Sequence, residues 1–191
     1  MKKKQDTKDL ILQSATRLFQ RQGYNGTGLN QIIEESGAPK GSIYYHFPNG
    51  KEEIALEAIS VMRKLVMEGA ETDLSAKNSA AEAFEFYANN IASVFDTRDC
   101  VVEGLSIGLI ASETASTHEK LRHACELVFK DWQSLYADIL EQYGFEKKRA
   151  KELGLTITAM IEGACLLSIT YQNGDPLRMI AKQLSLVLKT I

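Results

Sequence analysis

The sequence predicts an all-α fold, and three observations support this. Apolar residues recur three and four positions apart along most of the 191-residue chain, which is the period of an amphipathic helix. Runs of alternating Val, Ile and Thr, typical of strands, do not occur in the sequence. The chain also has only three prolines, and glycines stand where the helical pattern stops.

The first fifty residues predict three short helices. We expect the first over residues 7 to 22, followed by a glycine that stops it. The second follows Thr27 and ends at Gly37. Pro39 favours the first turn of a third helix, because the N–H that proline lacks would be unpaired there. The sequence FPNG, residues 47 to 50, then ends this helix.

The rest of the chain predicts longer helices. We expect them over residues 51–69, 79–95, 101–112, 117–143, 146–171 and 176–189. Two domains follow from this pattern: a three-helix domain over residues 1–50 and a larger helical domain over residues 51–191.

Charge is unevenly distributed along the chain, whose net charge is −3. Residues 1–51 carry eight lysines and arginines against four acids, whereas the remainder carries 14 against 21. A cationic end on an anionic body is what a protein needs when one end alone meets a polyanion.

Several classes of function lack support. Cys100, Cys125 and Cys165 are far apart and predict neither a disulfide framework nor a zinc site. His118 and His123 are five residues apart, the wrong spacing for two metal ligands on one helical face. A nucleophile motif is also missing. We therefore expect no metal, no cofactor and no enzymatic activity.

The sequence also predicts a soluble cytoplasmic protein with no membrane partner. The opening MKKKQDTKDL is basic like a signal peptide, but acids stand where its apolar region should begin. No later apolar run is expected to span a bilayer. The lysines at positions 2 to 4 form either a basic arm that contacts phosphates or a frayed, solvated terminus.

The second and third helices predict a helix-turn-helix, because they are joined by a short turn with a glycine. Ile43 and Phe47 are four apart and form the core side of the third helix. Other faces carry the candidate DNA contacts Lys40, Gly41, Ser42, Tyr44, Tyr45 and His46. Lysine can reach guanine or phosphate, and tyrosine offers a ring and a hydroxyl. For Tyr44, a half-buried position at the edge of the core remains equally open.

The segment GYNGTGLNQIIEESGAPKGSIYYHFPNGKEEI, residues 23–54, resembles the DNA-binding signature of the TetR family of bacterial repressors. Its PNG is one residue longer than the common spacing and, with SGAPKGS, resembles the LmrA/YxaF-like branch. The resemblance implies phosphate contacts from Thr27, Tyr45, His46 and Lys51, and base contacts from Lys40, Gly41 and Tyr44.

The last two helices predict a homodimer. Residues 152–171 are apolar or small all round, so both sides of this helix should be covered. The final helix carries a continuous apolar stripe. Two such helices from each chain would form a four-helix interface, as the TetR resemblance also implies, and two-fold symmetry suits a pseudo-palindromic operator. The alternative is that both helices are buried within a monomer.

The middle helices predict a site for a small-molecule effector. Most aromatic residues at helical spacing are ordinary core, but some could line an apolar pocket with a few polar groups. The candidates are Phe86, Phe129, Trp132, Tyr136, Met160 and Cys165. The family resemblance implies an apolar, often aromatic effector, and the branch suggests a planar polyphenol such as a flavonoid.

These features favour a dimeric repressor of double-stranded DNA that an effector releases by shifting a conformational population. Two alternatives remain. One is a helical enzyme or small-molecule carrier whose basic end is incidental. The other is an architectural DNA-binding protein without an effector.

Overall fold

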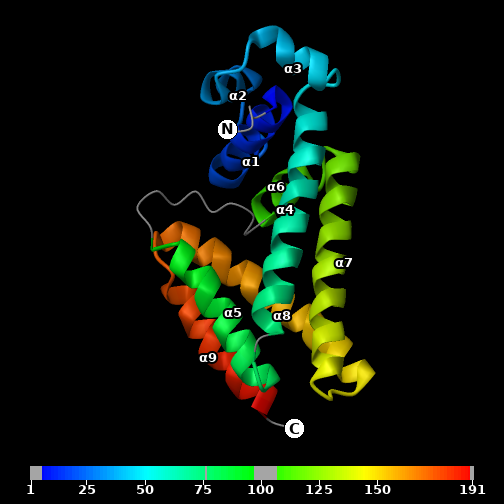
Figure 1. Ribbon diagram of the computed structural model, residues 1–191, viewed down its shortest axis with the longest axis vertical. Helices are drawn as coiled ribbons and strands as arrows, with labels where there is room; N and C mark the ends of the chain where they lie inside the picture. The colour runs from blue at the N-terminus through cyan, green and yellow to red at the C-terminus, as the bar shows by residue number, and fades with distance from the viewer. Residues whose placement is uncertain (1–5, 76, 97–106, 190–191) are drawn as a thin grey trace, which may run out of the picture. The chain divides into compact units, whose positions relative to one another are not determined.

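The computed structural model describes residues 6–75, 77–96 and 107–189, and every regular element in those ranges is an α-helix (Figure 1). The predicted fold class is therefore confirmed. The chain groups into two compact units: Met1–Arg63 with Val101–Glu126, and Lys64–Cys100 with Leu127–Ile191. The lysines at positions 2 to 4 and Cys100 lie outside the described residues.

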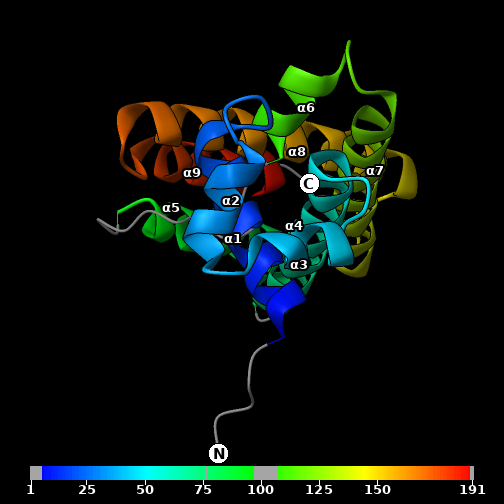
Figure 2. The same ribbon diagram turned by 90° about the horizontal axis from the view of Figure 1, so that it is seen from above.

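The first unit contains the three short helices that the sequence predicts, which are α1 (Thr7–Gln22), α2 (Leu29–Ser36) and α3 (Lys40–His46). They lie side by side, as Figure 2 shows. Gly37 ends α2 with φ of 64°, a left-handed conformation that favours glycine. Their core consists of fully buried apolar side chains, among them Ile11, Phe19, Ile32, Ile43 and Phe47.

Three further helices belong wholly or partly to this unit. They are α4 (Lys51–Leu74), α6 (Gly108–Thr114) and α7 (Glu119–Gln142). Both α4 and α7 begin in the first unit and continue into the second. The helix expected over residues 101–112 falls partly outside the described residues, and its described part is α6.

The second unit is built around α5 (Ala80–Val94), α8 (Lys147–Tyr171) and α9 (Asp175–Lys189), with α9 packed against both of the others. The apolar stripe of α9 is mostly turned inward, because Leu177, Ala181, Leu184 and Leu188 are all buried. At Gly174 a side chain would lie 2.2 Å from the carbonyl oxygen of Ala92, so only glycine permits this approach.

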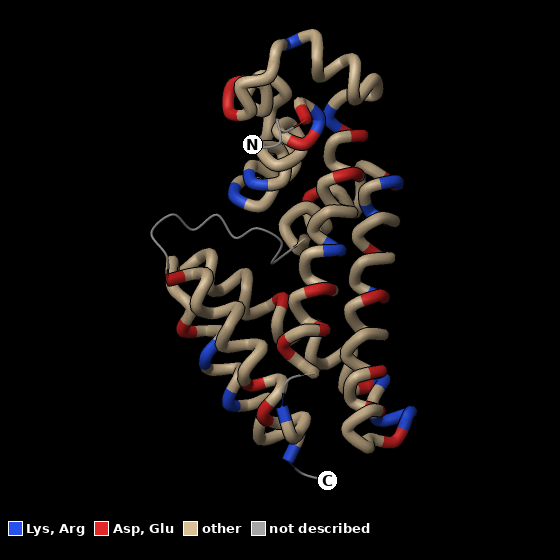
Figure 3. Tube along the Cα trace, in the orientation of Figure 1, with Lys and Arg blue, Asp and Glu red and all other residues tan. Residues whose placement is uncertain are grey.

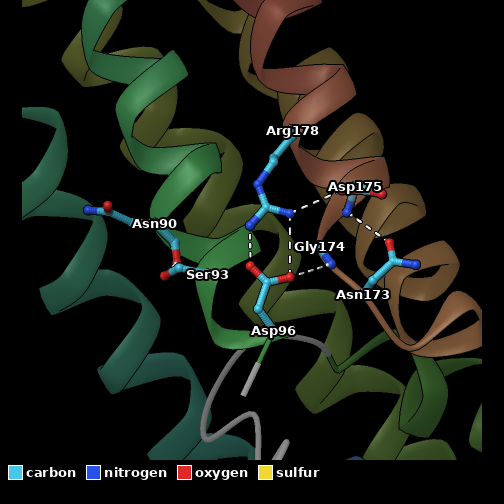
Figure 4. A network of polar contacts seen from close by, with 7 residues as sticks. All are labelled: Asn90, Ser93, Asp96, Asn173, Gly174, Asp175 and Arg178. Carbon is cyan, nitrogen blue, oxygen red and sulfur yellow. Dashed lines mark hydrogen bonds and ion pairs between the residues drawn. The ribbon is translucent and has the colours of Figure 1, made fainter. Parts of the chain in front are cut away.

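A polar network joins the end of α5 to the start of α9 (Figure 4). The Asp96 carboxylate accepts a hydrogen bond from the Gly174 amide at 3.2 Å and pairs with the Arg178 guanidinium. Arg178 also donates to Asp175, at 3.2 Å. The network thus adds polar contacts at one end of the α5–α9 pair.

The expectation about membrane-spanning runs needs correction for α8. By length and composition alone, this helix is apolar enough to cross a membrane. In the structure, 44% of its apolar window is buried against other helices. Core helices of soluble proteins pass the same test, because a helix covered on two sides is apolar nearly all round.

Candidate DNA-binding surface and effector site

Helix α3 is anchored by its apolar side, so that its other faces are available to a partner. Ile43 and Phe47 are completely buried. Pro39 precedes the helix, and its carbonyl accepts from the Ser42 amide at 2.8 Å. The Phe47 amide closes the helix by donating to the Ile43 carbonyl at 2.7 Å. Packing thus fixes which side chains of α3 face outward.

We call the six residues of α3 that the sequence singled out the recognition face: Lys40, Gly41, Ser42, Tyr44, Tyr45 and His46. Ser42 and His46 are half-buried, and the other four are exposed. Tyr45 is 82% exposed and Tyr44 is 53% exposed, so Tyr45 is the more accessible of the two rings. The rings of Tyr45 and His46 meet edge to face, with centroids 4.9 Å apart. A side chain added at Gly41 would meet only open space, so a partner can approach the backbone there.

The recognition face carries no negative charge of its own. No acid occurs between Glu35 and Glu52, and Figure 3 shows α3 free of acidic positions. Exposed aromatic hydroxyls, a lysine and a histidine remain. This combination can donate to phosphate oxygens and contact base edges.

Thr27 and Lys51 are placed differently from the recognition face. Thr27 is buried, and its hydroxyl donates to the Gly23 carbonyl at 2.7 Å. The Lys51 ammonium donates to the carbonyls of Tyr24, at 3.0 Å, and Thr27, at 3.1 Å. It also lies 4.2 Å from the centroid of the Tyr24 ring. Both side chains therefore brace the turn between α1 and α2.

Burial lowers the pKa of the Lys51 ammonium, and the nearby Glu113 carboxylate opposes this effect. The ammonium is thus held by carbonyls, a ring and an acid of its own chain. A phosphate contact would compete with these partners.

In the second unit, Tyr136 lies at the centre of a buried polar and aromatic group. Its hydroxyl is 3.1 Å from that of Tyr87, and its ring meets Phe84 edge to face at 5.7 Å. Burial raises the pKa of both phenols, so both remain protonated. Burial likewise raises the pKa of the Cys165 thiol, so it also remains protonated.

The other candidate effector residues differ in burial. Trp132 is buried, meets Phe129 edge to face at 5.8 Å, and has an indole N–H without a partner among the described residues. Phe86 instead lies on the exposed side of α5, with the Lys77 ammonium 3.7 Å from its ring centroid. Met160 is half-buried. The structure therefore does not bring Phe86 into the buried group.

Tyr87 was not among the sequence candidates, although it belongs to the apolar stripe of α5. A buried tyrosine needs a hydrogen-bond partner for its hydroxyl. Its place in an apolar stripe could therefore have indicated a buried polar group near Tyr87. The described residues hold no group of three His, Cys, Asp or Glu side chains that could bind a metal ion.

Known proteins resemble the chain along nearly its whole length. Residues 11–58 match the family described as bacterial regulatory proteins, tetR family, and residues 80–183 match the transcriptional regulator LmrA/YxaF-like C-terminal domain. The HTH-type transcriptional regulator LmrA of Bacillus subtilis is 46% identical over 96% of this chain and 97% of its own length. An uncharacterised HTH-type regulator of that species, YxaF, is 44% identical over 96% of each chain.

Solved structures agree on the fold. A TetR transcriptional regulator from Legionella pneumophila superposes with a TM-score of 0.83 at 23% identity, covering 98% of this chain and all of the other. A TetR-family regulator from Agrobacterium tumefaciens gives 0.81 at 19% identity, over 95% of this chain and 97% of the other.

Proposed function

Because the chain belongs to the TetR family of bacterial transcription regulators, with an LmrA/YxaF-like C-terminal domain, we propose that it is a dimeric repressor released from DNA by a small aromatic effector. The observation that carries this proposal is the recognition face: an acid-free helix surface with Tyr45 82% exposed, in a chain of net charge −3. Such a repressor acts on DNA in the cytoplasm.

On DNA, α3 enters the major groove, where some of its residues contact bases and others contact phosphates. Lys40 and Tyr44 contact base edges, with Gly41 allowing close approach. Ser42, Tyr45 and His46 donate to phosphates on either side. Thr27 and Lys51 contribute by holding the turn before α2, since their polar groups already have partners within the chain.

Dimerisation uses α8 and the outer side of α9. The stripe of α9 expected to meet a partner is mostly buried, but both helices expose other large apolar residues: Leu155, Leu166, Leu167, Tyr171, Met179, Leu186 and Val187. Many large apolar side chains exposed on two helices that pack together are typical of an interface. Two-fold symmetry then spaces two recognition faces for successive major grooves.

The effector binds in the second unit near Tyr136 and Cys165, with Trp132 four residues before Tyr136 on α7. The unpaired indole N–H and buried hydroxyls supply hydrogen-bonding groups within apolar surroundings, which suits a planar polyphenol such as a flavonoid. Release of the DNA requires only that the effector binds the DNA-free state of the protein more tightly than the DNA-bound state. A tenfold loss of DNA affinity corresponds to a difference of about 1.4 kcal/mol.

Selection of bound sequences from random DNA, followed by affinity measurement with and without quercetin, tests the proposal. A repressor of this kind selects a pseudo-palindrome, binds it with strong salt dependence, and loses it when the flavonoid is added. Failure to bind DNA would favour the carrier or enzyme alternative. Binding that no aromatic compound alters would favour the architectural alternative.

Two substitutions test the recognition face. We expect Lys40→Ala and Tyr45→Phe each to weaken operator binding by about fivefold or more, because each removes one contact worth roughly 1 kcal/mol. Thermal unfolding should not change, since both side chains are exposed. Lys147→Ala, which removes an exposed lysine from the second unit, is the matched control and should bind as the parent does. Parental affinity in both test variants would refute the assignment.

A further inference from the structure

Three asparagines of the chain are followed directly by glycine: Asn25, Asn49 and Asn173. An asparagine in this position can lose its side-chain amide, because glycine has no side chain to hinder attack by its main-chain nitrogen. We propose that Asn25 is a site of spontaneous deamidation, which converts it to an acid and adds a negative charge to the first unit. The modification itself is independent of the proposed function, and only its effect on DNA binding rests on that function.

Deamidation at Asn25 requires no reactant other than water. The main-chain nitrogen of Gly26 attacks the side-chain carbonyl carbon of Asn25, and its proton leaves with the side-chain nitrogen as ammonia. A five-membered succinimide ring remains. Water then opens the ring at either carbonyl group, which gives aspartate or isoaspartate. In isoaspartate the main chain is longer by one carbon atom.

At Asn25 both reacting groups are free to meet. Asn25 and Gly26 are exposed. Among the described residues, the Gly26 N–H and the Asn25 side-chain amide have no hydrogen-bond partner. The Asn25 main-chain N–H donates to Glu113 Oε2 at 2.9 Å, but this nitrogen takes no part in the reaction. The ring can therefore form without first breaking a hydrogen bond of either group.

The other two glycine nitrogens are already engaged. The Gly50 amide donates to the Phe47 carbonyl at 2.9 Å. The Gly174 amide is buried and donates to the Asp96 carboxylate at 3.2 Å (Figure 4). The Asn173 side chain is also held, because its nitrogen and its oxygen each have a main-chain partner, at 3.1 and 3.0 Å. Both sites must open locally before they can react.

The fold itself requires glycine after Asn25. A side chain at Gly26 would lie 2.4 Å from the Gln22 carbonyl oxygen, so a larger residue does not fit there. The Gly26 carbonyl accepts from the Gln22 side chain at 2.8 Å, and the longer main chain of isoaspartate would disturb this contact. Aspartate would place a second carboxylate near that of Glu113, and like charges repel. Either product therefore loosens the turn between α1 and α2.

Peptide mapping by mass spectrometry of the full chain, aged in mildly alkaline buffer, measures the three rates separately. Trypsin places the three asparagines in different peptides, which are residues 22–40, 41–51 and 152–178. We expect Asn25 to convert severalfold faster than Asn49 and at least about tenfold faster than Asn173, since opening that costs about 1.4 kcal/mol slows a reaction tenfold. A rate at Asn25 equal to or below either of the others would overturn the inference.

Two controls show whether the folded structure sets this order. In denaturant the three sites should convert at rates within about threefold of one another, because each glycine is then free of fixed partners. Asp96→Ala removes the acceptor of the Gly174 amide, so it should raise the rate at Asn173 by about threefold or more and leave Asn25 unchanged. If Asn25 is just as far ahead in denaturant, or if Asp96→Ala leaves Asn173 unchanged, the inference fails.

Operator binding measures the consequence of the modification. Asn25→Asp reproduces the aspartate product, and we expect it to bind the selected operator about threefold more weakly than the parent, because a negative charge on the first unit opposes a polyanion. Asn89→Asp adds the same charge at an exposed position of α5 in the second unit and should bind as the parent does. Equal affinity of Asn25→Asp and the parent would refute this consequence.

Ageing of the parent beside Asn25→Gln completes the test. Glutamine would have to form a larger and slower-closing ring, so Asn25→Gln should keep its operator affinity while the parent loses affinity as Asn25 converts. Equal losses in both proteins would mean that another change is responsible, against the inference. If the fresh parent binds no DNA, the proposed function fails, whereas the peptide map still decides whether Asn25 is the site of deamidation.

Discussion

Gln20, on α1, is a buried polar residue that lacks the partners its burial requires. Neither its amide nitrogen nor its amide oxygen has a hydrogen-bond partner among the described residues. An unpaired buried polar group costs about 1–3 kcal/mol, whereas an apolar group of similar shape carries no such cost. This side chain therefore lowers the stability of the first unit.

We predict that Gln20→Leu raises the free energy of unfolding by about 1 kcal/mol and increases Tm by a few degrees. Thermal unfolding followed by circular dichroism measures the change. Gln142→Leu, at an exposed position on α7, is the matched control and should leave Tm nearly unchanged. A lower Tm for Gln20→Leu would mean that the amide has a partner in solution.

Single residues also mark the limit of prediction from sequence. The outward direction of Tyr45 follows from the spacing of Ile43 and Phe47, and the structure leaves this side chain 82% exposed, whereas His46 is half-buried. The bracing role of Lys51 could not be predicted in this way. It depends on carbonyls some 25 residues earlier in the chain, which only the folded turn brings within 3.1 Å.

Among the elements, the pairing of α5 with α9 is reinforced at one end by an ionised group. The Arg178 guanidinium, assisted by the Gly174 amide, lowers the pKa of the Asp96 carboxyl below its ordinary value. A carboxyl whose pKa is lower in the folded state stabilises the fold above its unfolded-state pKa. That contribution is lost as the pH falls through the folded-state pKa.

We therefore predict that Asp96→Asn lowers stability at pH 7 and that its difference from the parent disappears in acid, well below pH 4. Denaturant unfolding of both proteins across this pH range measures the difference. Asp138→Asn, at an exposed position on α7, should show no such dependence. A constant difference between Asp96→Asn and the parent at all pH values would show that geometry, and not charge, holds the pair.

The helices themselves were largely predictable, because their signals are local. Gly23, Gly37 and Pro39 set the bounds of α1 to α3 with little error. Helix α4 continues five residues beyond the expected end, because a glycine inside a helix costs only about 1 kcal/mol and Gly69 does not interrupt it. The hydrogen bond from the Asn25 amide to Glu113 was not predicted, since nothing near Asn25 in the sequence indicates a carboxylate 88 residues away.

At the scale of the whole molecule, two helices belong to both compact units. Residues of α4 and α7 serve the first unit near their starts and the second near their ends. A ligand can shift an equilibrium only by its differential affinity for two states. In the proposed repressor, release therefore requires two states of the chain that bind the effector with different affinity.

The last prediction concerns assembly. Leu166 is 57% exposed on α8, among the apolar residues that we assign to the dimer interface. A glutamate there would place a charge and its symmetry mate in an apolar interface, which is strongly unfavourable. We expect Leu166→Glu to be monomeric at micromolar concentration by light scattering, with helicity unchanged and operator affinity reduced at least about tenfold.

Leu127→Glu is the matched control, because Leu127 is also an exposed leucine of the second unit but lies on α7, outside the proposed interface. It should remain dimeric and bind operator as the parent does. If Leu166→Glu stays dimeric, the subunits meet through another surface. If it becomes monomeric and still binds operator fully, one recognition face is sufficient, and the symmetry of the proposed operator complex is not needed for affinity.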